Sequence, residues 1–180
     1  MRLLITDDLA KVEGGPPGSC LIVVCPWLGA LPEETGLWLS ALPIHDVNAI
    51  AETDEPVAIP PALAPWVYFG VFALDRFRAP GRLLQRLRAR GIGRIVNLPS
   101  VTFFDGRTAA TLRSLDFGLA QEIEFLKRAR AEGLRAGLCA RTSQIAALDE
   151  KDRFDFILSH EGPGSALTLT PGVQELAALP

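Results

Sequence analysis

The amino-acid sequence predicts an α/β fold built on a parallel sheet. Continuous apolar runs alternate about four times with segments of helical periodicity. Runs without polar alternation are typical of strands buried on both faces, and repeated strand–helix units imply right-handed crossovers. Two architectures remain open, a (β/α) barrel and an open doubly wound sheet. The 180 residues are few for an eight-unit barrel, which usually needs ~250 residues.

The expected strands follow from the apolar runs, and the expected helices follow from apolar residues spaced three and four apart. Pro26 ends the first long strand, and Gly91 and Gly133 end two of the helices. In chain order we expect strands at 3–5, 20–25, 66–73, 94–98, 135–140 and 154–160, with helices at 33–42, 79–90, 116–132, 142–147 and 173–178. Residues 1–19 are expected to be a strand and linker segment before a single domain at 20–180.

Composition argues against several classes of protein. The net charge of −3 gives no indication of binding to nucleic acid or to an anionic membrane. No apolar run approaches the ~18 to 20 residues of a membrane span. The three cysteines form no CxxC pair, so neither a disulfide framework nor a structural zinc site is expected, and a cytoplasmic location fits best. Common nucleotide-binding, serine-hydrolase and zinc-protease motifs are absent.

Polar residues at the carboxyl ends of the expected strands are the candidates for chemistry, because ligands of parallel α/β proteins bind there. They are Asp75, Asn97, Asp105, Arg141, Thr142, His160 and Glu161. His160 lies where an acid–base residue is expected. Structural alternatives remain open: Asp75 would serve equally as a helix cap, Asp105 as part of a tight turn with Gly106, and Asn97 as an anchor for loop backbone.

Three segments of the sequence resemble the phosphoenolpyruvate hydrolase-like family, also called TIM-barrel signal transduction proteins. They are VYFGVFALDRFRAPGRLLQRLRARGIGRIVNLPSVTFFDG, LDFGLAQEIEFLKRARAEGLRAGLCA and FDFILSHEGPG. The shared frame is an Asp-x-Phe turn, Asn-x-Pro-x-Val, Asp-Gly, a helix with Glu-x-Glu, and a strand ending in His-x-Gly. Upstream, LPIHDVNAI is similar to the family's Leu-Pro-x-x-Asp-x-Asn-Ala-Ile segment. The resemblance covers roughly residues 20–164.

The resemblance implies a TIM-type parallel (β/α) barrel. The family continues through further βα units after its His-x-Gly strand, whereas this chain has 20 residues after His160. The expected fold over residues 20–180 is therefore an incomplete barrel of about five or six strands. Such a barrel exposes two strand edges, so we expect a homo-oligomer.

The resemblance also implies a site and a ligand. His160, Asp75 and Asp105 are the expected catalytic residues, with His160 as acid or base and the two carboxylates binding a cation or orienting water. Residues expected to bind substrate are Asn97, Asp46, Asn48 and Glu124. The expected ligand is a small oxoacid or a phosphorylated carboxylate, with Mg²⁺ as a candidate cofactor.

Two functions remain open. One is an enzyme, a hydrolase or lyase acting on a small carboxylate by acid–base chemistry. The other is a non-catalytic, small-molecule-binding or regulatory relative. Phe72 and Leu74 stand where the family has Cys and Thr, which favours the second function, whereas retention of the polar strand-end residues favours the first.

Overall fold

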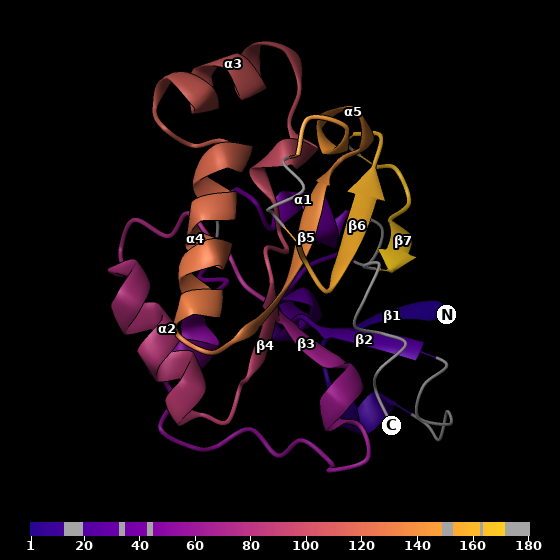
Figure 1. Cartoon of the computed structure of the whole chain (residues 1–180), viewed down its shortest axis with the longest axis vertical. Helices are drawn as coiled ribbons and strands as arrows, with labels where there is room; N and C mark the ends of the chain where they lie inside the picture. The colour runs from indigo at the N-terminus through magenta and orange to yellow at the C-terminus, as the bar shows by residue number, and fades with distance from the viewer. Residues whose placement is uncertain (13–19, 33–34, 43–44, 149–152, 163, 172–180) are drawn as a thin grey trace.

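The structure is a computed structural model that describes residues 1–12, 20–32, 35–42, 45–148, 153–162 and 164–171. Seven strands form one sheet in which each strand pairs with its neighbours in the chain (Figure 1). They are β1 (Arg2–Thr6), β2 (Cys20–Val24), β3 (Val67–Gly70), β4 (Arg94–Val96), β5 (Arg135–Arg141), β6 (Phe156–His160) and β7 (Thr168–Pro171). Strands β1 to β6 are parallel, and the sheet curls into a nearly closed barrel. The expected incomplete TIM-type barrel is thereby confirmed.

Strand β7 was not expected. It pairs antiparallel with β6, in a stretch for which the sequence predicted a loop. Leu167 and Leu169 pack against the barrel interior, whereas Thr168 and Thr170 are exposed. This alternation is typical of a strand with one buried and one solvent-exposed face. The terminal helix expected at 173–178 lies outside the described residues.

The outer face of the sheet is covered mainly by two helices. The helices are α1 (Gly36–Leu39), α2 (Pro80–Ala89), α3 (Gly106–Ser114), α4 (Leu119–Ala131) and α5 (Thr142–Ile145). Helices α2 and α4 carry the buried leucines that pack on β3, β4 and β5. Helix α3 was not expected, because none of its residues is buried and it therefore lacks an apolar stripe.

Among the described residues, no helix combines the length and the apolarity needed to span a bilayer.

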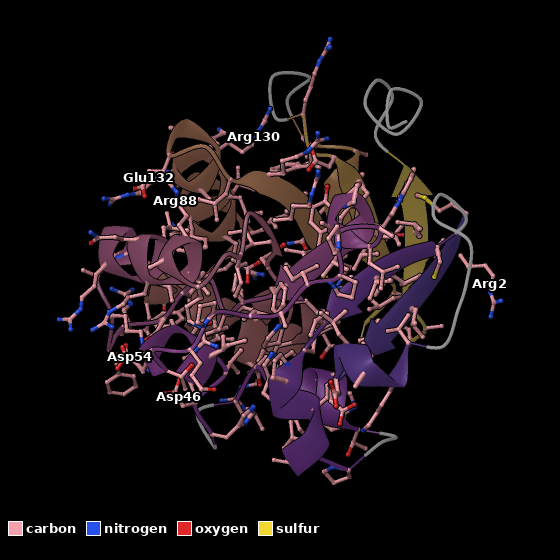
Figure 2. The ribbon with its side chains drawn as sticks, turned by 90° about the horizontal axis from the view of Figure 1, so that it is seen from below. Arg2, Asp46, Asp54, Arg88, Arg130 and Glu132 are labelled. Atoms are coloured by element: carbon pink, nitrogen blue, oxygen red, sulfur yellow. The ribbon has the colours of Figure 1, made fainter. Side chains whose placement is uncertain are left out.

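The inner face of the barrel forms a second, packed core. Leu21, Tyr68 and Phe156 fill it near the amino ends of the strands, and the rings of Tyr68 and Phe156 meet edge to face at 4.7 Å. Gly137 makes room for Phe156, because a Cβ at position 137 would lie 2.2 Å from the ring. The interior is therefore filled by side chains, as in other small barrels. The charged residues labelled in Figure 2 lie at the periphery.

The segment between β2 and β3 extends the inner core beyond the strand ends. It contains the 3₁₀ turn η2 (Pro26–Ala30) and helix α1. Trp27 is buried in the inner core, and Leu37 and Trp38 pack against the same cluster. The loops that follow β4, β5 and β6 supply the polar residues at this end of the barrel.

Candidate functional site

A chain of three hydrogen bonds crosses the carboxyl end of the barrel. Nε2 of His160, the last residue of β6, lies 2.9 Å from Oγ1 of Thr102. The Thr102 hydroxyl lies 2.8 Å from Oγ of Ser100, which in turn lies 2.7 Å from Oε2 of Glu122 on α4. All four residues are buried. We call Glu122, Ser100, Thr102 and His160 the hydroxyl relay.

Glu122 supplies the carboxyl group of the relay and is fully buried. Its Oε1 accepts a hydrogen bond from the Val101 backbone at 3.0 Å, and its Oε2 accepts one from the Asn97 side chain at 3.0 Å. Burial raises the pKa of Glu122 to about 8, although the hydrogen bonds from Ser100, Val101 and Asn97 act in the opposite direction. Glu122 is therefore mainly a neutral carboxylic acid at pH 7.

Asn97, which directly follows β4, hydrogen-bonds to β5 next to Glu122 of the relay. Its side-chain amide donates to the Cys139 carbonyl at 2.9 Å and accepts from the Cys139 backbone N–H at 2.6 Å. The same amide group donates to Glu122. These contacts agree with the alternative in which Asn97 anchors backbone, and they also make Asn97 a support for Glu122. Its expected contact with substrate stays a prediction.

His160 is a neutral imidazole in this environment. Burial and the positive charge of Arg141 together lower its pKa to about 4, although Glu161 acts in the opposite direction. Its ring packs against Phe103 at 4.6 Å. Nδ1 has no hydrogen-bond partner among the described residues. One ring nitrogen is thus held by Thr102, and the other is not held by a polar group.

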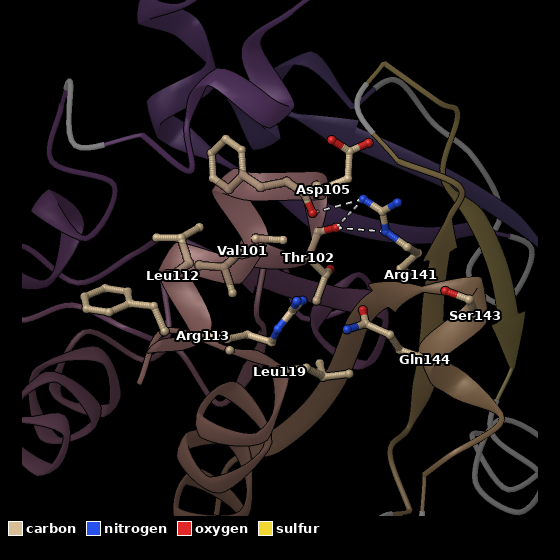
Figure 3. A pocket seen from close by; sticks show the side chains of 14 residues that line it. Val101, Thr102, Asp105, Leu112, Arg113, Leu119, Arg141, Ser143 and Gln144 are labelled. Atoms are coloured by element: carbon tan, nitrogen blue, oxygen red, sulfur yellow. Dashed lines mark hydrogen bonds between the residues drawn. The ribbon is translucent and has the colours of Figure 1, made fainter. Parts of the chain in front are cut away.

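A pocket of about 410 Å³ opens beside the relay (Figure 3). It lies between the loop after β4, helix α3, the start of α4 and helix α5. Its polar lining consists of Thr102, Asp105, Arg113, Arg141, Ser143 and Gln144. Arg141 donates to the carbonyl oxygens of Thr102 at 3.2 Å and Phe104 at 3.0 Å, which holds the wall of the pocket in place. Two guanidinium groups facing one concave space favour an anionic ligand.

Asp105 is exposed at the rim of this pocket and directly precedes helix α3. It is the N-cap residue of that helix by position, but its side chain makes no capping hydrogen bond. The expected tight turn is instead the first turn of a helix. The carboxylate remains available to a molecule in the pocket.

A second polar cluster brings together three more of the predicted residues. Asn48 donates to the carbonyl of Phe72 and to Asp75, both at 3.0 Å, and it accepts from the Phe72 N–H. Arg78 binds Asp75 at 2.8 Å and Asp46 at 2.6 Å. The cluster ties the segment before β3 to the loop that follows this strand. Roles of Asp46, Asn48 and Asp75 in binding a ligand stay predictions.

Asp75 caps a turn rather than helix α2. Its Oδ1 accepts from the Phe77 N–H at 2.8 Å, whereas α2 begins at Pro80 after Ala79. Burial by itself raises the pKa of Asp75, but hydrogen bonds from Asn48 and Arg78 outweigh it and keep the pKa below its ordinary value. Asp75 is therefore a charged, fully engaged carboxylate.

The donor set of this cluster does not fit Mg²⁺. The Arg78 guanidinium already donates to carboxylate oxygens of Asp46, Glu52 and Asp75, at nitrogen–oxygen distances of 2.6 to 2.8 Å. Magnesium requires an octahedral set of oxygens around the ion itself. Within the part of the chain that the structure describes, no group of three or more His, Cys, Asp or Glu residues is arranged to hold a metal ion.

Glu124 lies outside both clusters. It is exposed on α4 and pairs with Lys127 at 3.2 Å. Together with Asp75 it lines a separate pocket of about 680 Å³ between the loop after β3 and α4. On this helix, Glu122 is the glutamate that points inward. It shares a face with Leu119 and Leu126, three residues before it and four after it, and this spacing was the available sequence signal.

Comparison with known proteins identifies the family. The model described as "Phosphoenolpyruvate hydrolase-like" matches residues 34–167. The chain is 36% identical over 131 residues to "Uncharacterized protein y4oT" of Sinorhizobium fredii (strain NBRC 101917 / NGR234), which is 72% of this chain and 64% of that protein. It is 33% identical over 76 residues to "Putative transcriptional regulatory protein y4pA" of the same organism, which is 42% of this chain and 12% of that protein. The matches thus span less than two thirds of either relative. Because the family match covers most of the sequence, this chain belongs to the phosphoenolpyruvate hydrolase-like family.

Proposed function

We propose that this protein binds a small oxoacid or phosphorylated carboxylate in the 410 Å³ pocket and acts on it by acid–base chemistry. The observation that carries the proposal is the position of Thr102. This residue lines the pocket, and its hydroxyl lies 2.9 Å from Nε2 of His160. A proton can therefore pass between a bound molecule and His160 through one hydroxyl group.

The charges of the pocket suit this chemistry. Arg113 and Arg141 face the space in which the ligand's carboxylate or phosphate would lie, and they would also stabilise the anion left after a proton is removed. Asp105 at the rim would orient a water molecule or a hydroxyl group of the ligand. In this proposal a neutral His160 is the base, as its low pKa requires at neutral pH.

A second function is a binding or regulatory protein that uses the same pocket without turnover. The observation that favours it is the burial of His160, which is 2% exposed and is not part of the pocket lining. The printed name of one relative, "Putative transcriptional regulatory protein y4pA", agrees with such a role for that relative. The two functions share a ligand class and differ in whether His160 is needed for binding or for conversion.

The proposal is tested with pyruvate, oxaloacetate, phosphoenolpyruvate and inorganic phosphate as probes. We expect at least one carboxylate probe to raise the melting temperature by mass action, and Arg113→Gln to remove most of that increase. Arg107→Gln is the matched control, since Arg107 is exposed on the same helix but does not line the pocket. Conversion of the stabilising probe is then followed by proton NMR.

The outcomes separate the two functions. Turnover that is lost in His160→Gln while the thermal shift persists supports the enzyme. A thermal shift without any turnover supports the binding protein. If no probe stabilises the protein, or if Arg113→Gln keeps the full shift, the pocket is not the ligand site.

The proposal includes self-association of the barrel. Strand β1 pairs only with β2, and β7 pairs only with β6, so each leaves one strand edge without a partner among the described residues. Open edges of this kind favour pairing with another chain. Light scattering coupled to size-exclusion chromatography measures the mass, and a monomer at all concentrations would contradict the homo-oligomer.

A further inference from the structure

The hydroxyl relay has a direction, because each of its two hydroxyl groups carries a single hydrogen. Ser100 and Thr102 can both donate toward Glu122, or both donate toward His160. A mixed arrangement would leave two hydrogens facing each other or a bond without a hydrogen. The two ends of the relay are therefore coupled through the two hydroxyl groups.

The state of Glu122 selects the direction. When Glu122 is ionised, both of its oxygens only accept, so Ser100 donates to it and Thr102 donates to Ser100. Nε2 of His160 must then carry a hydrogen and donate to Thr102. When Glu122 is protonated it donates to Ser100, the direction reverses, and Nε2 accepts from Thr102 while the imidazole hydrogen resides on Nδ1.

Among the described residues, no other polar contact to the imidazole ring competes with that of Thr102. Nδ1 of His160 has no hydrogen-bond partner in the described part of the chain, so the Nε2 side alone decides the tautomer. The charged groups that act on His160 are Arg141 on β5 and Glu161 in the following loop. The titratable group beside Glu122 is the buried thiol of Cys139, whose pKa is raised well above its ordinary value, so that it remains uncharged.

We propose that Glu122 is a positioning residue that sets the tautomer of His160 through the hydroxyl groups of Ser100 and Thr102. The coupling itself depends only on the hydrogen-bond geometry. Its catalytic consequence rests on the proposed function of the pocket. Glu122 does not line the 410 Å³ pocket, so it acts on a bound molecule only through the other members of the relay.

The consequence is that protonated Glu122 leaves a lone pair on Nε2 of His160, which can then accept a proton. A ligand X–H bond breaks and its proton forms a new O–H bond on Thr102, while the hydroxyl hydrogen of Thr102 moves to Nε2. The electron pair stays on the ligand, and His160 becomes an imidazolium ion with hydrogen on both nitrogens. When Glu122 is ionised, Nε2 already carries a hydrogen, so it cannot accept this proton. Since burial raises the pKa of Glu122 to about 8, the competent tautomer predominates at neutral pH.

Nitrogen NMR of the imidazole tests the coupling without any ligand. The chain has two histidines, so His45→Gln gives a background in which His160 is the only source of imidazole signals. In ¹⁵N-labelled protein we expect the hydrogen on Nδ1 at about pH 6 and on Nε2 at about pH 10, with the ring neutral throughout. The midpoint of the exchange should follow the titration of Glu122.

Variants of the relay separate coupling from folding. Glu122→Gln should abolish the pH-dependent exchange between the two tautomers. Thr102→Val should also abolish it, whereas Thr102→Ser should preserve it, and Ser100→Ala provides a second interruption if Thr102→Val does not fold. The same tautomer at both pH values in the background protein, or an exchange that survives in folded Glu122→Gln, would overturn the proposal. A tautomer exchange in a protein that binds none of the probe acids would preserve the coupling and reject the proposed function.

Discussion

The hydroxyl of Thr102 lies 2.9 Å from Nε2 of His160, and Thr102 also lines the pocket that Arg113 and Arg141 face. Thr102 thereby joins a surface pocket to His160 on one side and, through Ser100, to the buried carboxyl group of Glu122 two hydrogen bonds away on the other. The hydroxyl relay brings together side chains from the loop after β4, from α4 and from β6, which are distant from one another in the sequence. The site therefore depends on the tertiary fold of the barrel.

Glu122→Gln should change how stability depends on pH. The pKa of Glu122 is raised from 4.5 to about 8. Its contribution to the free energy of unfolding is therefore fully present below pH 4.5 and is lost as pH rises to 8. The pKa of His160 is lowered from 6.5 to about 4, so its contribution is present above pH 6.5 and is lost as pH falls to 4. The two slopes oppose each other between pH 4.5 and 6.5, which leaves the Glu122 slope from pH 6.5 to 8.

One pKa unit corresponds to about 1.4 kcal/mol, so the Glu122 contribution falls by about 2 kcal/mol across that upper window. Urea unfolding of wild type and Glu122→Gln at several pH values measures the difference. As pH rises from 6.5 to 8, the free energy of unfolding of the variant should increase relative to that of the wild type. A difference that does not change with pH would mean that Glu122 is ionised at neutral pH.

Asn97→Ala should destabilise the protein by about 3 kcal/mol, because it leaves buried polar groups without partners. The substitution removes both bonds to the Cys139 backbone and the bond to Glu122. Ser114→Ala is the control, since it removes one hydrogen bond at an exposed helix end. Chemical denaturation gives both values, and equal losses in the two variants would refute the structural role of Asn97.

Added Mg²⁺ should not change the melting temperature of the wild type in the absence of other ligands. The Arg78 guanidinium already pairs with Asp46, Glu52 and Asp75, so it stands in the position that a cation shared by these carboxylates would take. Calorimetry with Mg²⁺ and with EDTA makes the comparison. A magnesium-dependent rise in melting temperature that disappears in Asp75→Asn would show that a metal displaces Arg78.

Arg78→Met should cost about 2 to 3 kcal/mol, because it leaves the Asp75 carboxylate, whose side chain is 7% exposed, without its guanidinium partner. Arg86→Met is the control, because Arg86 lies 3.6 Å from Asp54, a residue whose side chain is 97% exposed. We expect no measurable loss there. Comparable losses in the two variants would argue that Arg78 acts only at the surface.

Gly137→Ala should destabilise the barrel interior by about 3 kcal/mol or more. The added Cβ would lie 2.2 Å from the Phe156 ring, which is fully buried and faces Tyr68. Gly93→Ala is the matched control, since a Cβ there meets nothing within 4 Å. Thermal unfolding compares the variants. Equal melting temperatures would show that Phe156 can move aside at little cost.

Much of the barrel was predictable because its strands are apolar runs and its large helices carry an apolar stripe. Helices α2 and α4 follow the expected segments closely, since Leu83, Leu87 and Leu126 recur with the helical period. Helix α1 is shorter than expected, and α3 was missed because its residues do not face a core. Strand β7 was missed because its short alternating stretch follows a Gly/Pro-rich loop.

The candidate site was only partly predictable. The rule that ligands bind beyond the strand ends selected Asn97 and His160, and both lie at the hydroxyl relay. It did not select Glu122, Ser100 or Thr102, because a helix and a loop supply them. Arg78 was missed for a similar reason, since charged side chains in loops give no sign of their partners.

By itself, the sequence determined the order and kind of most elements and the family, because apolar periodicity and local motifs act over a few residues at a time. Only the tertiary structure decided which polar groups meet. The pKa of Glu122 is raised by burial in the folded chain, and Arg78 meets Asp46 and Glu52, which lie 32 and 26 residues before it. Burial and hydrogen-bond partners are properties of the folded barrel, and they decide what each side chain can do.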